Sequence, residues 1–224
     1  MHYPFRFNTR IPAGALACQS AGTLHRTPGK ALFLLWTLLL AAGACALSRY
    51  EFNGTMTTGV AEHWPDNSVV QLDSERPTLV MFLHPRCPCS AASITQLDRV
   101  LRRSPGRFRT WVLLVRPAGV PETWEAGANA EAALRLPETT LLIDSAGELA
   151  RQFGARYSGT VQAFDTGGNR RFTGGITASR GHEGESLGGL ALRDIGAGRV
   201  PDAASMPVFG CSLMGIDQDQ GAKT

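Results

Sequence analysis

Apolar runs bounded by proline and glycine predict a strand followed by a helix near the middle of this chain. Residues 78–83, TLVMFL, are almost wholly apolar and lie between Pro77 and Pro85, which is typical of a central strand buried on both faces. Residues 94–101 then repeat apolar side chains at helical spacing, on one face. The sequence therefore predicts a strand, a tight turn and an amphipathic helix in this region.

The same patterns predict alternating strands and helices along the rest of the chain. Alternation favours a parallel sheet, and the turn at residues 167–169, Gly-Gly-Asn, adds an antiparallel hairpin at one edge. The other predicted strands are residues 69–72, 110–115, 139–143, 159–165 and 171–174, and the later helices are residues 122–134, 148–153 and 186–197. We expect an α/β fold with a central mixed sheet flanked by helices.

The uncharged apolar run at residues 31–47 predicts a transmembrane helix, which we place at residues 31–48. Roughly 17–25 residues are needed to span a bilayer. Basic residues precede the run and few follow it, so we expect a cytoplasmic N-terminus and a periplasmic domain on a single-pass cell-membrane anchor. A cleaved signal peptide ending near residues 42–44, or a lipoprotein lipidated on Cys45, is the alternative. Each of the three predicts export.

The predicted membrane segment divides the chain into regions of different character. A disordered basic tail precedes it, and a linker follows it. We place the tail at residues 1–30, the linker at residues 49–68, the main domain at residues 69–200 and a C-terminal tail carrying Cys211 at residues 201–224.

Composition and charge narrow the function. Hydrophobic residues make up 43% of the 224 residues and charged residues 18%, which is ample for a packed core. The net charge is only +3, and no basic face with interleaved aromatic residues follows the tail, so we expect no nucleic-acid partner. The five cysteines are Cys18, Cys45, Cys87, Cys89 and Cys211. Three of them fall in the exported part, which predicts one redox pair and a further thiol rather than a disulfide scaffold.

The turn after the central strand holds Cys87, Pro88 and Cys89. Pro88 suits the first position of a helix, so we expect Cys87 to be the N-cap and Cys89 the second helical residue. The positive end of a helix dipole lowers the pKa of a thiol. The motif therefore predicts a reactive thiolate, with an inert buried pair or a static disulfide as the alternative.

Three segments carry a resemblance to a known family: FLHPRCPCS, FDTGGNRRFTGGITASRGHEG and PVFGCSL. Together they resemble membrane-anchored thioredoxin-like proteins of the RedB type, and residues 69–199 resemble the thioredoxin-like superfamily. The resemblance implies a thioredoxin-like fold in which Cys87 matches the attacking cysteine and Ser90 occupies the place of the second. Cys89 is one position early, and a disulfide across so short a spacing is strained and easily reduced.

Further residues are candidates for the predicted site, and some of them also have a purely structural interpretation. The region before the fourth strand, residues 157–161, lacks the cis-proline usual in the superfamily, which leaves room for a metal. His84 either lines the site or simply ends the strand. Arg180 and His182 belong to the site by resemblance, since an arginine beside a thiol favours the thiolate. Cys211 is either a second reacting thiol or a lone thiol in a tail.

These observations predict a membrane-anchored, exported thiol–disulfide oxidoreductase that acts on protein thiols or disulfides without a cofactor. Cys87 is its expected nucleophile, Cys89 its resolving thiol and Cys211 a relay. The alternative is a copper-binding protein or metallochaperone of the Sco type, with Cys87, Cys89 and either His84 or His182 as ligands of Cu(I). A peroxidase and a non-catalytic interaction domain are further alternatives, although the threonine of peroxiredoxins is missing before Cys87.

Overall fold

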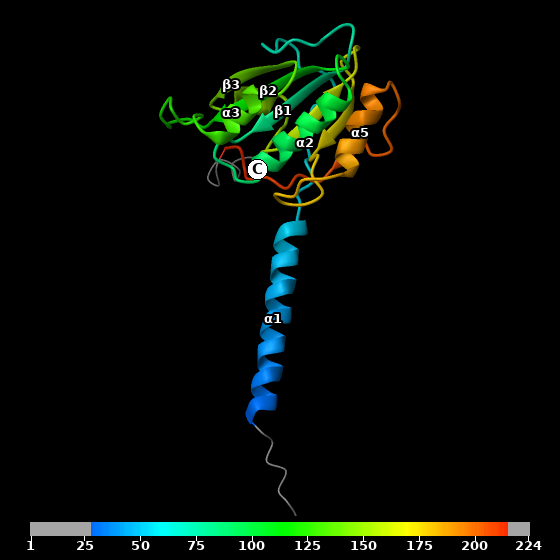
Figure 1. Ribbon diagram of the computed structural model, residues 1–224. Coiled ribbons are helices and arrows are strands. Elements are labelled where there is room, and N and C mark those ends of the chain that lie inside the picture. Colours follow the sequence, from blue (N-terminus) through cyan, green and yellow to red (C-terminus); the bar gives the residue numbers. More distant parts are fainter. Residues whose placement is uncertain (1–27, 215–224) are drawn as a thin grey trace, which may run out of the picture. The chain divides into compact units, whose positions relative to one another are not determined.

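Six β-strands form one central sheet, in the order β3-β2-β1-β4-β5-β6 (Figure 1). Strands β1, β2 and β3 are mutually parallel, whereas β4 runs antiparallel to both β1 and β5. Short strand β6 adds a parallel edge on β5. The strands are β1 Thr78–Leu83, β2 Arg109–Arg116, β3 Thr139–Ser145, β4 Thr160–Phe164, β5 Arg170–Gly174 and β6 Ser205–Met206. This confirms the predicted mixed α/β sheet.

The computed structural model describes residues 28–214, and the chain divides into two units, Met1–Gly43 and Ala44–Thr224. Most of the predicted basic tail, residues 1–27, lies outside the described residues, as do residues 215–224. The helices are α1 Pro28–Phe52, α2 Ser90–Arg103, α3 Ala128–Leu134, α4 Glu148–Gln152 and α5 Leu187–Gly196.

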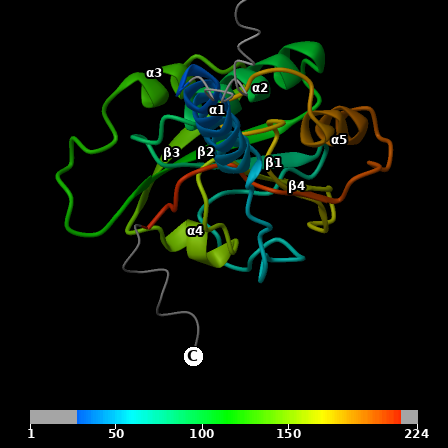
Figure 2. The same ribbon diagram turned by 90° about the horizontal axis from the view of Figure 1, so that it is seen from below.

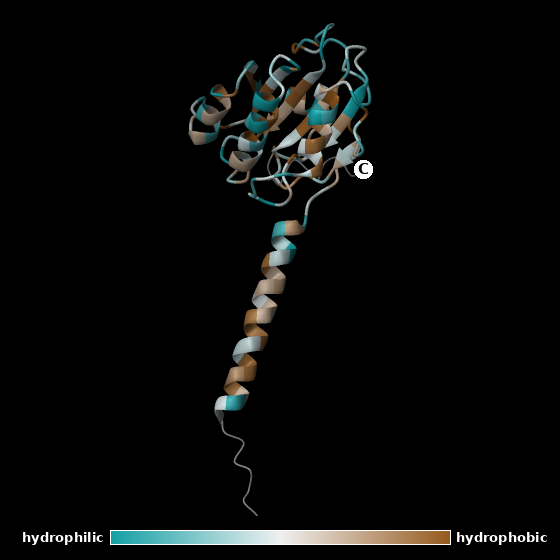
Figure 3. Cartoon of the chain, turned by 45° about the vertical axis from the view of Figure 1, so that its right-hand side comes forward, coloured by the Kyte–Doolittle hydropathy of each residue, from teal (hydrophilic) through white to brown (hydrophobic). Residues whose placement is uncertain are grey.

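Helix α1 contains the predicted membrane segment. Its large apolar side chains are exposed; Leu32 is 69% and Leu38 67% accessible. Figure 3 shows apolar residues along the helix and more polar residues at its two ends. Its stretch Gly29–Phe52 is long and apolar enough to cross a membrane, and an N-terminal signal sequence has the same properties.

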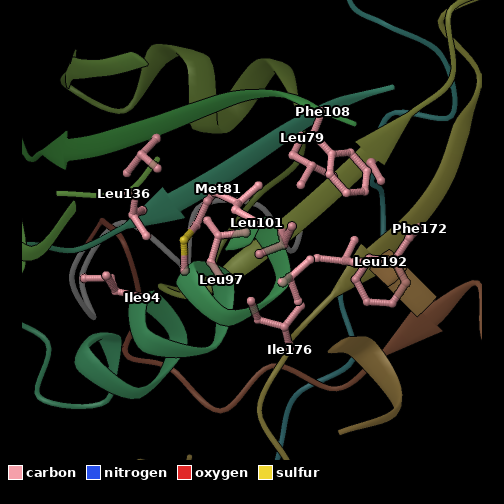
Figure 4. Packing of buried hydrophobic residues seen from close by; sticks show 14 of the residues in the cluster. Leu79, Met81, Ile94, Leu97, Leu101, Phe108, Leu136, Phe172, Ile176 and Leu192 are labelled. Atoms are coloured by element: carbon pink, nitrogen blue, oxygen red, sulfur yellow. The ribbon is translucent and has the colours of Figure 1, made fainter. Parts of the chain in front are cut away.

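The two faces of the sheet are covered by different helices, with α2, α3 and α5 on one face and α4 on the other (Figure 2). Alternate residues of β1 point to opposite faces. Leu79, Met81 and Leu83 join the core that packs against α2 and α5 (Figure 4), whereas Val80 and Phe82 join the core around α4. All six residues of β1 are buried. The strand that leads to the Cys87 turn is thus fixed from both sides.

Two predicted elements differ from the structure, and one observed strand was not predicted. Residues 69–72 form no strand, because Val70 packs into the core and the Gln71 carbonyl accepts a hydrogen bond from the Trp111 indole. Helix α3 begins only at Ala128, since residues 121–126 form turns and Gly127 has a positive φ of 145°. Strand β6 was not predicted.

The predicted linker is in contact with the domain in the structure. Thr55 forms an antiparallel bridge with Val208, and His63 forms one with Asn169. Trp64 packs edge-on against the rings of Phe153 and Phe164. Residues 55–64 therefore form part of the surface of the domain.

Candidate active site

The Cys87 turn follows directly from the buried strand β1. The Cys87 N–H donates to the His84 carbonyl at 3.1 Å, and the Ser90 N–H donates to the Cys87 carbonyl at 3.1 Å. Because these two turns use the backbone groups of the motif, α2 starts at Ser90 and its N-cap is Cys89. The prediction that Cys87 is the N-cap and Cys89 the second helical residue was wrong by two positions. Both cysteines still adjoin the N-terminal end of α2.

A second thiol lies against Cys87, and it belongs to Cys211. The two Sγ atoms are 2.9 Å apart, and the Cys211 N–H points to the Cys87 Sγ at 3.4 Å. Cys87 is only 1% accessible, whereas Cys211 is exposed. The structure therefore brings together two cysteines that are 124 residues apart in sequence.

Cys211 is carried by residues 205–214, which we call the C-terminal strap. The strap begins with β6 and then crosses the domain at the N-terminal end of α2 (red in Figure 1). Its backbone is hydrogen-bonded on both sides of the cysteine: Val208 exchanges two 2.9 Å bonds with Thr55, and the Leu213 N–H donates to the Arg156 carbonyl at 2.9 Å. Leu213 is fully buried. The predicted C-terminal tail is thus ordered up to Met214.

Gly210 allows the strap to pass close to the loop before β4. A Cβ atom at this position would overlap the carbonyl group of Ser158. The next residue, Cys211, accepts a 2.8 Å hydrogen bond from the Ser158 N–H through its carbonyl oxygen. The missing side chain therefore sets how near Cys211 comes to the Cys87 turn.

The three thiols, Cys87, Cys89 and Cys211, differ in the direction in which the protein shifts their pKa values. Burial alone would raise the pKa of Cys87, but hydrogen bonds from the Cys211 side chain and backbone, from Ser90 and from the Cys89 backbone bring that pKa below the ordinary thiol value. Partial burial of its sulfur, the hydrogen bond to Cys87 and the charge of Cys87 raise the pKa of Cys211 to about 12. Burial and the charge of Cys87 also raise the pKa of Cys89, against an opposing effect of Arg180. Of the three thiols, Cys87 is therefore the one that loses its proton most readily.

Two buried serines connect the turn to the loop before β4. The Oγ atoms of Ser90 and Ser158 are 2.7 Å apart, and Ser158 Oγ also accepts the His84 N–H at 2.8 Å. No peptide bond between residues 28 and 214 is cis, and Ser158 and Gly159 stand before β4. Ser158 thus ties the end of β1, the start of α2 and the strap into one structure.

Helix α3 holds the other side of the turn. Asn129 Nδ2 donates to the carbonyl oxygens of Pro85 at 2.8 Å and Cys87 at 2.9 Å. The Arg86 guanidinium lies over the Trp124 ring, 3.8 Å from its centre. The Asn129 hydrogen bonds hold the backbone of the turn, and the contact with Trp124 holds the side chain of the residue before Cys87.

His84 lies beside this turn but not in contact with a sulfur. Its Nδ1 accepts the Arg86 N–H at 3.2 Å, and its ring meets the Trp124 ring edge-on. Burial and the nearby positive charge of Arg86 lower the pKa of His84, so the imidazole is neutral over a wider pH range than usual.

Of the two predicted loop residues, Arg180 is the one near a thiol. A hydrogen bond and the positive charge of Arg180 favour the thiolate of Cys89. The Arg180 guanidinium also stacks on the Tyr50 ring, 4.9 Å from its centre, and the backbone N–H of Arg180 donates to the Glu51 carbonyl at 3.0 Å. His182 is exposed, and its Nδ1 is 3.0 Å from the Arg180 carbonyl.

Among residues 28–214, no three histidine, cysteine, aspartate or glutamate side chains come together in an arrangement that fits a metal ion. The groups that hydrogen-bond Cys87 Sγ include the Cys211 thiol and backbone, Ser90, and both the backbone and the side chain of Cys89. The copper ligands expected from the sequence, Cys87 and Cys89 with either His84 or His182, form no such three-residue cluster among these residues, and copper binding stays a prediction.

Several residues of the site were not predicted from sequence. Asn129 and Trp124 lie in a region expected to be a continuous helix, and Ser158 was noticed only as part of a segment without proline. Ser90 did carry a signal, because it occupies the place of the second cysteine in the superfamily pattern. For Asn129, the pairing with the turn depends on the exact start of α3, which the sequence pattern did not show.

Comparison with known proteins identifies the fold and not the function. Neither a family model nor a curated protein sequence matches the chain. Among solved structures, a hypothetical protein from Sinorhizobium meliloti is similar, with a TM-score of 0.57 and 17% identity over 71% of this chain and 97% of that one. An uncharacterized conserved protein from Geobacillus kaustophilus gives a TM-score of 0.53 and 21% identity over 74% and 93% of the two chains.

A thioredoxin-like protein, solved in its oxidized form, is a more distant neighbour. It gives a TM-score of 0.43 and 19% identity over 65% of this chain and 97% of that one. The domain that follows α1 has a mixed α/β fold with a six-stranded central sheet flanked by helices, and it shares this fold with the Sinorhizobium and Geobacillus proteins.

Proposed function

We propose that this chain is a membrane-anchored, exported thiol–disulfide oxidoreductase in which Cys87 is the thiolate of the exchange reaction, as in the RedB-type proteins that its sequence resembles. The observation that carries the proposal is the pairing of Cys87 Sγ with a second thiol at 2.9 Å beside the N-terminal end of a helix. The hydrogen bonds to Cys87 favour its thiolate, and a thiolate is the nucleophile in disulfide exchange.

The chemistry needs only protein thiols and disulfides. The Cys87 sulfur forms a disulfide with a second cysteine of the chain. Thiol–disulfide exchange then either transfers this disulfide to a partner dithiol or regenerates it from a partner disulfide. Asn129, Ser90 and Ser158 act as positioning residues for the turn. The reaction requires neither a cofactor nor a metal, and the copper alternative gains no support from the donor geometry.

The test uses the full chain in detergent and reduction of a model protein disulfide by a dithiol. Cys87→Ser should abolish turnover, because the pKa values of the other two thiols, Cys89 and Cys211, are raised rather than lowered. A matched control is Cys45→Ser, which removes an exposed thiol in α1 and should leave the rate unchanged. Unchanged turnover in Cys87→Ser would remove the proposed function. Stoichiometric Cu(I) binding that needs Cys87, in a chain without turnover, would favour the copper alternative.

The membrane anchor and export are tested separately. Alkaline phosphatase fused after Thr224 should be active in a bacterial host, because this enzyme folds only outside the cytoplasm. The full-length chain should stay with membranes after alkaline carbonate extraction. A shortened chain in the soluble fraction would instead mean that α1 is a cleaved signal sequence, and an inactive fusion would contradict export.

A further inference from the structure

We propose that the redox disulfide of this protein joins Cys87 to Cys211, and that Cys211 is the sulfur attacked by a partner thiolate. This inference rests on the proposed function and names the second cysteine of its site. It differs from the expectation from the sequence, which assigned the resolving role to Cys89.

The strap holds Cys211 at the distance that a disulfide needs. Backbone bonds at Val208, Cys211 and Leu213 fix the strap before, at and after the cysteine. The two Sγ atoms, 2.9 Å apart, are less than about 1 Å beyond a covalent S–S bond of about 2.05 Å. Forming the disulfide therefore requires only a small local movement.

Cys89 is less suited to that bond. It is separated from Cys87 by one residue and is held in helical backbone geometry at the N-cap of α2, with φ −72° and ψ −17°. A bond across so short a segment leaves little choice of side-chain dihedral. The Cys89 thiol also hydrogen-bonds Cys87, but it interacts with Arg180 as well, and Arg180 favours Cys89 as a separate thiolate.

Accessibility and leaving-group strength select Cys211 as the attacked sulfur. Cys87 is 1% accessible, whereas Cys211 is exposed, so a partner reaches the disulfide from the side of Cys211. Attack there expels the sulfur of Cys87, and a thiol of lower pKa leaves faster. The pKa of Cys87 is below its ordinary value, whereas that of Cys211 is raised to about 12, so both factors point to the same path.

The exchange is balanced without any further reagent. A partner thiolate attacks the Cys211 sulfur, the S–S bond to Cys87 breaks, and Cys87 leaves as a thiolate. A second partner thiolate then attacks the partner sulfur, and Cys211 leaves and takes a proton from water. The partner dithiol has lost two electrons, which the protein disulfide has gained. The reverse sequence, with a protein disulfide as oxidant, restores the Cys87–Cys211 bond.

The disulfide is mapped in the full chain, in detergent, with Cys18 and Cys45 replaced by serine and after treatment with oxidised dithiothreitol. Trypsin places Cys87 and Cys89 on one peptide, residues 87–99, and Cys211 on another, residues 200–223. We expect a bond between the two peptides that persists in Cys89→Ser and is lost in Cys87→Ser. A bond within residues 87–99, or no bond, would overturn the inference.

The attacked sulfur is found with glutathione as a single-thiol probe. Limiting glutathione is added to the oxidised chain, and the reaction is stopped with acid before a second exchange. The mixed disulfide should lie on residues 200–223. Glutathione on residues 87–99 would contradict the assignment of Cys211.

Turnover separates this inference from the proposed function. Cys211→Ser should lose turnover and Cys89→Ser should keep it; thermal unfolding of both reduced variants is the control for folding. If Cys89→Ser loses turnover and Cys211→Ser keeps it, the oxidoreductase function stands and this inference falls. If Cys87→Ser keeps turnover, the function itself falls.

Discussion

The two sulfurs at the centre of this site are held by very different parts of the molecule. Cys87 follows a strand of six buried residues, and the backbone around it is fixed by Asn129, which donates to the Cys87 carbonyl, and by Ser158, which accepts the His84 N–H. Cys211 lies on a strap held by backbone hydrogen bonds and by the buried side chains of Val208, Phe209 and Leu213.

The difference lies in how much burial holds each sulfur. All six residues of β1 are buried, whereas the buried residues of the strap are Val208, Phe209 and Leu213. We therefore expect local opening of the strap to cost less free energy than global unfolding. Four substitutions test the comparison.

Phe82→Ala should have the largest effect on stability, because it removes a buried side chain from β1, the strand that positions Cys87. Phe82 is fully buried on β1 and lies against the Phe153 ring. Removing a buried phenylalanine lowers the free energy of unfolding by about 3–5 kcal/mol. Chemical denaturation of the reduced chain measures this, and Val69→Ala, at a position that is 73% exposed, is the matched control. Equal stability of the two variants would mean that β1 does not anchor the site.

Leu213→Ala should loosen the strap and leave the core intact. Replacing a buried leucine with alanine in a core lowers the free energy of unfolding by about 2–5 kcal/mol. At Leu213 we expect this loss to favour local opening of the strap. Cys87 should then react faster with iodoacetamide, because the strap covers its sulfur. Leu190→Ala, on the partly exposed side of α5, should leave that rate unchanged. An unchanged rate in Leu213→Ala would show that the strap does not shield Cys87.

Asn129→Ala should weaken the fixed side by a smaller amount. It removes the donor to two carbonyl oxygens of the turn, and the loss of such bonds costs about 1–3 kcal/mol. Exchange should slow while the strap stays in place, as measured by turnover together with the thermal midpoint. Glu131→Ala on the exposed face of α3 is the control. If both variants behave alike, Asn129 has no positioning role.

Cys211→Ala should produce the smallest change, a shift in the titration of Cys87. The Cys211 side chain donates to the Cys87 thiolate, so its loss should raise the pKa of Cys87 toward the ordinary value. Thiolate formation, followed by ultraviolet absorbance, would then begin at higher pH. Cys211→Ser keeps a donor and should stay closer to the natural chain. Identical titration of the Ala and Ser variants would exclude this contribution.

Patterns of local sequence predicted most of the sheet. The apolar run between two prolines gave the bounds of β1, alternation of strands and helices predicted the parallel pairing of β1 with β2, and the Gly-Gly-Asn turn predicted the antiparallel β4–β5 hairpin. The antiparallel pairing of β4 with β1 was not predicted. These predictions succeed because burial on both faces imposes an apolar composition on a central strand. The start of α2 was misplaced, since turns at Cys87 and Ser90 compete with the helix for the same backbone groups.

The strap shows why the rest of the site could not be predicted. Residues 207–214 have no helical or strand periodicity, and their partners, Thr55, Arg156 and Ser158, are far away in sequence. Cys211 was recognised as a candidate, but spacing along a chain carries no information on distance in space. The contact between Cys87 and Cys211 depends on these long-range backbone bonds.

Gly210 lies against the Ser158 carbonyl group, and this close approach sets the position of the neighbouring Cys211. Any larger residue would push the strap away from the Ser158 carbonyl and carry the neighbouring cysteine with it. If the two sulfurs form the proposed disulfide, the free energy of that bond would then change without alteration of either cysteine. The absence of one methyl group at residue 210 thus sets the distance between two side chains that it does not itself touch.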